Sequence, residues 1–159
     1  MATSIADLVG ESKLVAIIRI TSEEARLIDD GRGIGTFYKF DVISVLKGAV
    51  ANSDIDSIEL PGGTYVYKDK SMAVIEVTKR PRLRVGYTYF VFCSPSSTSP
   101  QILEPSFESQ GIFELSDDGV TVRHYSMEPG DQIRSQYNDE PEKQLLSDVM
   151  DVISKEKHE

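Results

Sequence analysis

The alternation of apolar and polar residues predicts that most of this chain forms β-strands. In residues 36–46 the two kinds of side chain alternate as in a half-buried strand, and the alternation fails at Ile43-Ser44, which indicates a β-bulge. Residues 87–93 are apolar almost throughout, which predicts a central strand. The segments with strand character are 13–21, 36–46, 55–60, 71–79, 87–93, 111–115 and 120–125.

Segments rich in glycine, proline or serine separate these strands. Residues 29–35 (DDGRGIG) and 94–100 (SPSSTSP) have the composition of loops, and Pro61-Gly62-Gly63 ends the third strand. The Asp118-Gly119 pair, between the last two short strands, is the strongest hairpin signal in the chain.

Both ends of the chain show the periodicity of helices. At the N-terminus, Thr3 or Ser4 can cap a short helix that ends at Gly10. Over residues 138–156 the period changes to that of a longer helix, begun by a cap at Asn138 or Asp139. Because an amphipathic helix normally packs on its own sheet, we expect its apolar stripe to join the core. The stripe comprises Leu145, Leu146, Val149, Met150, Val152 and Ile153.

Seven strands bounded by helices predict one mainly β domain over residues 1–159. No helical pattern lies between the strands, so parallel β-α-β units are not expected. We therefore predict an antiparallel β-barrel, closed or nearly closed, over residues 13–125, followed by the C-terminal helix 138–156. Cys93 is the single cysteine, and its apolar surroundings indicate a buried structural thiol.

Three segments point to a known family: residues 14–20 (LVAIIRI), 38–48 (YKFDVISVLKG) and 83–92 (LRVGYTYFVF). Their order resembles the barrel of the netrin and tissue-inhibitor-of-metalloproteinase type, in which a first strand leads into a YxFxVxxVLKG strand and then an LxxGxxYxxF strand. It is also similar to a group of uncharacterised exported bacterial domains. The resemblance covers residues 13–125 and implies an OB-like Greek-key barrel, a fold that hosts many unrelated binding functions.

The N-terminus departs from that family. Its metalloproteinase inhibitors chelate the zinc of their targets through an N-terminal Cys-x-Cys, whereas this chain begins Met1-Ala2-Thr3-Ser4 and has no second cysteine. No active residue of the family is carried over, so inhibition by zinc chelation is not expected.

Charge is distributed unevenly along the chain. The net charge is −9, and residues 101–159 hold the whole acidic excess, which argues against a general nucleic-acid binder. The opposite sign gathers at Lys79, Arg80, Arg82 and Arg84. Such a cluster is either a solvated loop, alone or paired with the acidic C-terminal third, or a docking patch for an acidic partner.

Residues that usually carry catalysis or hold a metal are few. The two histidines, His124 and His158, and one cysteine cannot supply a structural zinc site of ordinary ligand count. No Gly-x-Ser-x-Gly motif presents a nucleophile to His124. The carboxylates Glu104, Glu108 and Glu114 are available as an acid pair for glycoside hydrolysis, but any acidic domain offers as many. We expect neither an enzyme nor a resident cofactor or metal.

The predicted binding residues are aromatic and basic. Tyrosine and arginine anchor many protein interfaces, and these types occur in two loop segments. The candidate residues are Tyr65, Tyr67, Lys68, Lys79, Arg80, Arg82 and Arg84. An equal alternative is that Tyr65 and Tyr67 pack on the domain's own rim.

We interpret the chain as a non-enzymatic, protein-binding or inhibitor-like β-barrel module whose partner has an acidic surface. The alternatives are a carrier of a small apolar ligand and an OB-type single-strand nucleic-acid binder that uses Tyr65, Tyr67, Lys68 and Lys70. The resemblance implies the bacterial envelope or exterior. The abrupt start at Met1 fits either a trimmed export signal, with a periplasmic or secreted protein, or a native cytoplasmic start. No apolar stretch is long enough to span a membrane, and the oligomeric state stays open.

Overall fold

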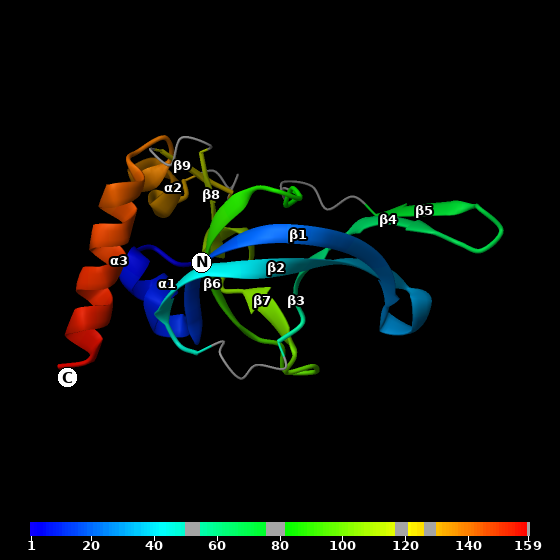
Figure 1. Ribbon diagram of the computed structural model, residues 1–159, viewed down its shortest axis with the longest axis horizontal. Coiled ribbons are helices and arrows are strands. Elements are labelled where there is room, and N and C mark those ends of the chain that lie inside the picture. Colours follow the sequence, from blue (N-terminus) through cyan, green and yellow to red (C-terminus); the bar gives the residue numbers. More distant parts are fainter. Residues whose placement is uncertain (50–54, 76–81, 117–120, 126–129, 159) are drawn as a thin grey trace.

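The chain folds into a mainly β structure with a short helix near its N-terminus and a longer one at its C-terminus, as predicted (Figure 1). The computed structural model describes residues 1–49, 55–75, 82–116, 121–125 and 130–158. In chain order the helices and strands are α1 (Ile5–Glu11), β1 (Leu14–Ile28), η1 (Asp29–Gly31), β2 (Gly33–Lys47), β3 (Ser57–Pro61), β4 (Gly63–Val66), β5 (Met72–Ile75), β6 (Thr88–Pro95), β7 (Ile102–Pro105), η2 (Glu108–Gly111), β8 (Ile112–Leu115), β9 (Val122–His124), α2 (Gln132–Tyr137) and α3 (Glu142–Glu156).

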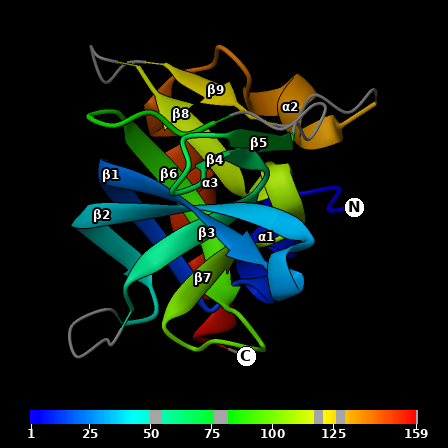
Figure 2. The ribbon, with the colours of Figure 1, turned by 90° about the vertical axis from the view of Figure 1, so that its right-hand side faces the viewer.

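Within the described residues, seven strands form one sheet in the order β1-β2-β3-β7-β6-β8-β9, and β6 also pairs with β1. The pairing of β1, β2, β3, β7 and β6 therefore returns to the strand at which it began (Figure 2). The prediction of purely antiparallel strands is wrong at one pair, since Ser57 and Ile58 of β3 run parallel to Ile102 and Leu103 of β7. The long connection through β4, β5 and β6 lets the chain enter β7 in the direction of β3.

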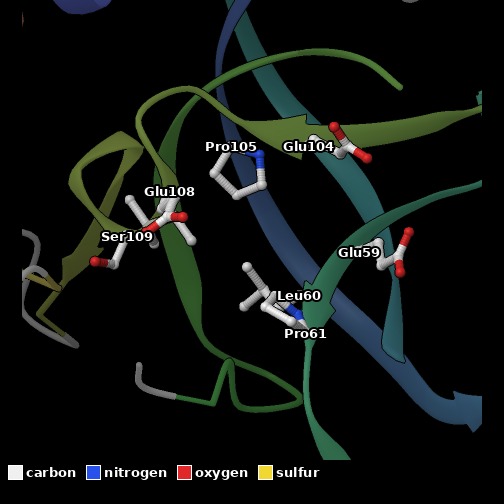
Figure 3. Close-up of a pocket in the computed structure, with 8 residues that line it drawn as sticks. Glu59, Leu60, Pro61, Glu104, Pro105, Glu108 and Ser109 are labelled. Atoms are coloured by element: carbon white, nitrogen blue, oxygen red, sulfur yellow. The ribbon is translucent and has the colours of Figure 1, made fainter. Parts of the chain in front are cut away.

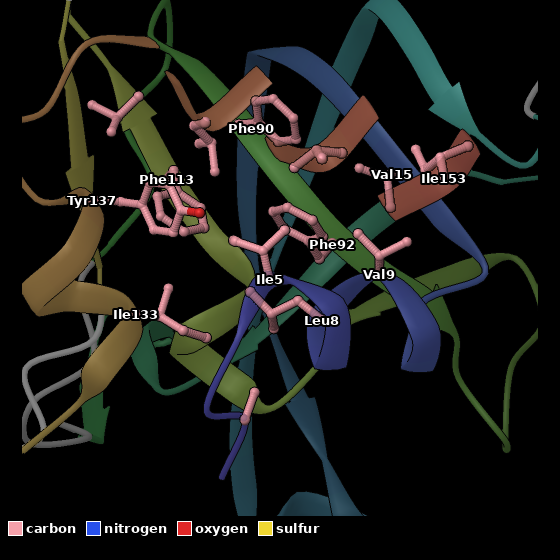
Figure 4. Packing of buried hydrophobic residues seen from close by; sticks show 14 of the residues in the cluster. Ile5, Leu8, Val9, Val15, Phe90, Phe92, Phe113, Ile133, Tyr137 and Ile153 are labelled. Atoms are coloured by element: carbon pink, nitrogen blue, oxygen red, sulfur yellow. The ribbon is translucent and has the colours of Figure 1, made fainter. Parts of the chain in front are cut away.

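Two buried clusters lie on opposite faces of β6. Phe90 and Phe92 pack with the helices on one face (Figure 4), whereas Tyr89, Val91 and Cys93 belong to the cluster on the other face. All five side chains are fully buried. A strand covered on both faces has no polar face to expose, which explains the continuous apolar run and confirms that this strand is central.

The first cluster joins α1 and α3 to the sheet (Figure 4). The predicted core role of the C-terminal stripe is confirmed for Leu145, Val149 and Ile153, whereas Met150 is 45% exposed. None of the helices in the described ranges is long and apolar enough to cross a membrane.

The second cluster takes side chains from all five strands of the closed pairing. Its buried members are Leu14, Ala16, Ile18, Ile20, Tyr38, Ile58, Leu83, Tyr89, Val91, Cys93, Leu103, Ile112 and Tyr125. The structural assignment of Cys93 is confirmed by its complete burial, which also raises the pKa of its thiol to about 12.

Local details of the sequence prediction are confirmed in part. Ile17 pairs with Ser44 and Ile18 with Val42, so Ile43 is left out of the register as the predicted bulge. β8 and β9 pair antiparallel as the sequence predicts, and the Asp118-Gly119 pair between them lies outside the described residues. Ser4 caps α1, with the backbone N–H of Asp7 donating to its hydroxyl.

Several element boundaries differ from the prediction. The N-terminal helix continues through Gly10 to Glu11, and the long C-terminal helix begins at Glu142 after Pro141, so residues 138–141 are outside it. Elements β4, β7 and α2 were not expected, because each is at most six residues long and lies beside glycine, proline or serine signals. Tertiary pairing, rather than local pattern, defines strands this short.

Candidate binding surface on the β4–β5 hairpin

Strands β4 and β5 form a two-stranded hairpin that extends away from the main sheet, at the opposite end of the molecule from α3 (Figure 1). The turn between them is closed by a hydrogen bond from the backbone N–H of Tyr67 to the carbonyl of Ser71, at 2.9 Å. The carboxylate of Asp69 accepts from the backbone N–H and the hydroxyl of Ser71, and these bonds lower the pKa of Asp69. The tip of the hairpin is therefore a defined turn.

The base of the hairpin is fixed to β2. The backbone N–H of Gly62 donates to the carbonyl of Ile34 at 2.8 Å, and the hydroxyl of Thr36 donates to the carbonyl of Gly62 at 2.7 Å. Gly63 has φ +134°, and a Cβ there would lie 2.4 Å from the Oγ1 of Thr36. Glycine is therefore required where the chain leaves the sheet.

One face of the hairpin exposes apolar side chains. The register pairs Val66 with Met72 and Thr64 with Val74, which places these four residues on one face. Val66 is 57% exposed, Met72 67% and Val74 57%. We name Val66, Met72 and Val74 the arm face. Three adjacent apolar side chains this open to water are a feature of binding surfaces.

The predicted tyrosines lie on the opposite face of the same hairpin. The rings of Tyr65 and Tyr67 pack edge-to-face with their centroids 5.0 Å apart. Tyr65 is half-buried and Tyr67 is 40% exposed. Lys68 lies at the exposed tip, and Lys70 beside it has a left-handed backbone with φ +67°. The hairpin thus carries three of the predicted residues: Tyr65, Tyr67 and Lys68.

The described residues of the predicted basic cluster 79–84 do not belong to the hairpin. Arg82 and Arg84 lie in the turn before β6, on the body of the molecule, whereas Lys79 and Arg80 fall outside the described residues. The guanidinium of Arg84 lies over the ring of Tyr87, 5.3 Å from its centroid. That tyrosine, and then the charge of Glu114, raise the pKa of Arg84. The partners of Arg84 are thus groups of its own domain.

Three buried tyrosines hold this turn, and sequence reasoning did not identify them. The backbone N–H of Arg84 donates to the hydroxyl of Tyr89 at 2.8 Å, and the backbone of Leu83 hydrogen-bonds to Tyr38. The hydroxyl of Tyr125 donates to Glu114 at 2.9 Å and approaches the carbonyl of Arg82 at 3.4 Å.

Burial is the main cause of a raised pKa for each phenol of this group, and the pKa of Tyr38 reaches about 12. The tyrosines occur in apolar strand patterns that indicate core positions, and nothing in those patterns indicates that their hydroxyl groups meet. We name Tyr38, Tyr89 and Tyr125 the tyrosine clamp.

Of the candidate groups for catalysis, His124 is enclosed, whereas Glu104 and Glu108 are exposed and line a cleft (Figure 3). The ring of His124 is buried against Phe113, its Nε2 lies 2.8 Å from the carbonyl of Gln110, and burial lowers its pKa. Among the described residues, no group of three or more His, Cys, Asp or Glu side chains is arranged to hold a metal ion. The Asp117–Gly119 turn lies outside the described residues.

Comparison with known proteins adds no family. No protein-family model matches the chain, and no curated protein matches it.

Proposed function

We propose that this protein is a non-enzymatic binding module that engages another protein through the arm face. The observation that carries the proposal is the exposure of Val66, Met72 and Val74 on a hairpin that projects from the sheet. Apolar side chains adjacent to one another on a projecting element become buried when a partner covers them, and that burial is favourable.

The framework of the proposal is an OB-like five-stranded barrel. Its support is the closed pairing of β1, β2, β3, β7 and β6, together with the buried cluster to which all five strands contribute. In this interpretation the barrel is a rigid base and the hairpin is an insertion between its third and fourth strands. Large side chains of the second cluster, such as Tyr89 and Ile112, occupy the interior, which favours a surface-binding module over a carrier with a ligand inside.

The low stability expected of a two-stranded hairpin favours a partner that stabilises it. An isolated two-stranded sheet is only marginally stable in water, and β4 and β5 pair only with each other among the described strands. A partner that lays an extended segment along the outer edge of β5 would both pair its open backbone groups and cover Met72 and Val74. Lys68 and Lys70 at the tip favour acidic groups on that partner.

The test is site-specific photo-crosslinking, with a photoreactive amino acid at Thr64, which shares the face of Val66, Met72 and Val74, and, as the control, at Ile43 on β2, which is 53% exposed. We expect a defined protein to crosslink from position 64 and not from position 43. With that protein purified, the double variant Met72→Gln/Val74→Asn should weaken its binding about 30-fold, the effect of losing a typical interface hot spot. Ile43→Asn should leave the affinity unchanged.

Equal crosslinking from both positions, or equal affinities of the hairpin variant and the wild type, would contradict the proposal.

A further inference from the structure

Strand β9 and helix α2 form a small unit beside β8, away from the β4–β5 hairpin (Figure 1). Among the described elements, β9 pairs only with β8 and α2 packs mainly on β9. The chain after α2 returns along the other edge of β9, where the backbone N–H of Val122 donates to the carbonyl of Glu140 at 3.0 Å and that of Asp139 donates to the carbonyl of Val122 at 2.8 Å. We name residues 122–124 and 131–141 the β9–α2 unit.

Gln110 of η2 holds this unit to the body of the molecule. Its side-chain amide donates to the carboxylate of Asp131 and to the carbonyl of Ala2, each at 3.0 Å, and its Oε1 accepts from the backbone N–H of Ala2 at 2.9 Å. Asp131 is also the N-cap of α2, where it accepts from the backbone N–H of Arg134. Gln110, Asp131 and Ala2 are at most 3% exposed. The N-terminal segment, η2 and α2 therefore meet in a network that excludes water.

The ring of His124 joins β9 to the same network. It is 1% exposed, and its centroid lies 4.4 Å from that of the Phe113 ring on β8. Its Nε2 lies 2.8 Å from the carbonyl oxygen of Gln110, and because a carbonyl can only accept, Nε2 carries the hydrogen. The other ring nitrogen, Nδ1, is buried with no hydrogen-bond partner among the described residues. The site is thus built for the neutral imidazole.

Protonation of His124 would place a donor where this site offers no acceptor. In the imidazolium both ring nitrogens are donors, so Nδ1 would become a buried, charged and unpaired N–H. Leaving such a donor without a partner is costly, and more so when the group is charged. The ring can avoid that cost only by reaching water, which requires β9 to move away from Phe113 and Gln110.

The charged groups around the ring do not remove this cost. On α2, Asp131 favours the imidazolium and Arg134 opposes it, and burial outweighs both, so the pKa of His124 is lowered. β8 contributes Phe113 and η2 contributes the amide and carbonyl of Gln110, none of which titrates. On the helices, the phenol of Tyr137 in α2 donates to Asp148 of α3.

We propose that His124 is an acid-sensitive latch: its protonation in mild acid releases the β9–α2 unit from β8, while the strands of the closed pairing stay paired. A three-residue strand and a six-residue helix make few backbone hydrogen bonds, which makes a unit of this size able to open separately. β1, β2, β3, β7 and β6 pair with one another without β9. Opening would expose the side chains of Phe113, Ile133 and Tyr137 in the first buried cluster (Figure 4).

The test is amide hydrogen exchange of the full chain by NMR at pH 7.5 and pH 5.0, with rates expressed as protection factors so that the intrinsic pH dependence of exchange cancels. We expect protection of Val122 and Asn138 in the unit to fall at least tenfold at pH 5.0, and that of Ile18 in β1 and Val91 in β6 to change less than twofold. An opened histidine with the ordinary pKa of about 6.5 is protonated about thirtyfold at pH 5.0, which is the upper limit of the effect.

Variants assign the effect to His124. His124→Gln keeps a donor for the Gln110 carbonyl and does not titrate, so protection of the unit should be the same at both pH values. His124→Phe serves as a second non-titrating variant in case His124→Gln does not fold. The control is His158→Gln, which changes the other histidine and should behave as the wild type. Unchanged protection in the wild-type unit, an equal loss in the unit and in β1 and β6, or the same loss in a non-titrating variant would overturn the proposal.

Discussion

For single residues, the sequence predicts whether a side chain is buried but not which groups it contacts. The sequence marks Cys93 and the clamp tyrosines as apolar-strand residues, and the structure confirms that they are buried. It does not indicate that the hydroxyl of Tyr125 approaches the hydroxyl of Tyr89 and the backbone carbonyl of Arg82, because those contacts join distant segments. Burial follows from a local pattern, whereas the partner of a buried polar group follows from topology.

Cys93 should react slowly with a thiol reagent in the native protein and rapidly after denaturation. Its side chain is fully buried, and the raised pKa keeps the thiol protonated, so both access and the reactive thiolate are lacking. The measurement is the time course of absorbance with an aromatic disulfide reagent, with and without denaturant. Stoichiometric labelling of the folded protein within seconds would refute this expectation.

His124 should make stability fall in mild acid. Burial is the main cause of its lowered pKa, the nearby Arg134 lowers it further, and the Gln110 carbonyl and Asp131 act in the opposite direction. The folded-state pKa of His124 is below the unfolded value of about 6.5, so the contribution of the neutral ring to the free energy of unfolding is fully present above that pH. It is lost as the pH falls from there through the folded-state pKa.

Denaturant titrations between pH 7.5 and pH 5 measure this effect. His124→Phe should flatten the decline in the free energy of unfolding over this range, even if it lowers the free energy at every pH. The control is His158→Gln, since His158 is exposed near the end of the chain. An equal slope for the wild type and His124→Phe would show that other groups cause the pH dependence.

At the scale of elements, the sequence predicts burial and local features better than element boundaries and long-range pairing. The bulge at Ile43, the central strand β6 and the antiparallel pairing of β8 with β9 follow from local patterns and are confirmed. β4 and β7 were not predicted, because each has four residues and adjoins a segment, 61–63 or 94–100, whose glycine, proline and serine content indicates a turn or loop. The sequence does not indicate the arm face, because Val66, Met72 and Val74 become neighbours only through the β4–β5 register.

Gly63→Ala should destabilise the base of the hairpin. The new Cβ would meet the hydroxyl of Thr36, and φ at this position is +134°. We expect a loss of about 1–3 kcal/mol in the free energy of unfolding. The control is Gly31→Ala, where φ is +86° and a new Cβ would have nothing within 4 Å, so this variant bears backbone strain alone and should cost less. Chemical denaturation of both variants measures the two losses in the free energy of unfolding, and equal losses would contradict the expectation.

Leu145→Ala on α3 should lower the free energy of unfolding by about 2–5 kcal/mol, because it leaves a cavity in the first buried cluster. Met150→Ala on the same helix removes a side chain that is 45% exposed and should cost well under half as much.

Deleting residues from 138 onward should expose the same cluster and cause aggregation or loss of cooperative unfolding. A truncated protein that stays monomeric and equally stable would mean that α3 is not needed for the fold.

At the scale of the whole molecule, the placement of charge predicts partners more directly than the fold does. The chain carries a net charge of −9, with the acidic excess in residues 101–159, which include α3. The hairpin tip with Lys68 and Lys70 lies at the opposite end (Figure 1). The acidic partner that we propose would meet these lysines at the hairpin tip and would be repelled by the acidic excess of residues 101–159.

Mixed-sequence single-stranded DNA and RNA should not bind at micromolar concentration and physiological salt, because a polyanion long enough to follow the surface meets the acidic segment. Fluorescence anisotropy over a salt series measures this. Micromolar binding that Arg82→Glu weakens would instead favour a nucleic-acid binder.

The contact between β1 and β6 has a consequence for how fast the chain folds. Leu14 pairs with Cys93 and Arg19 with Thr88, so this seam joins residues that are 69 to 79 positions apart in the sequence. Loop-closure entropy must be lost before such distant pairs stabilise one another, and domains dominated by long-range pairs fold in milliseconds to seconds. The β1–β2 hairpin is local and can form early, whereas β6 must wait for the intervening chain. We therefore expect formation of this seam to limit the folding rate, so that substitutions along it change the refolding rate more than substitutions in α3 do.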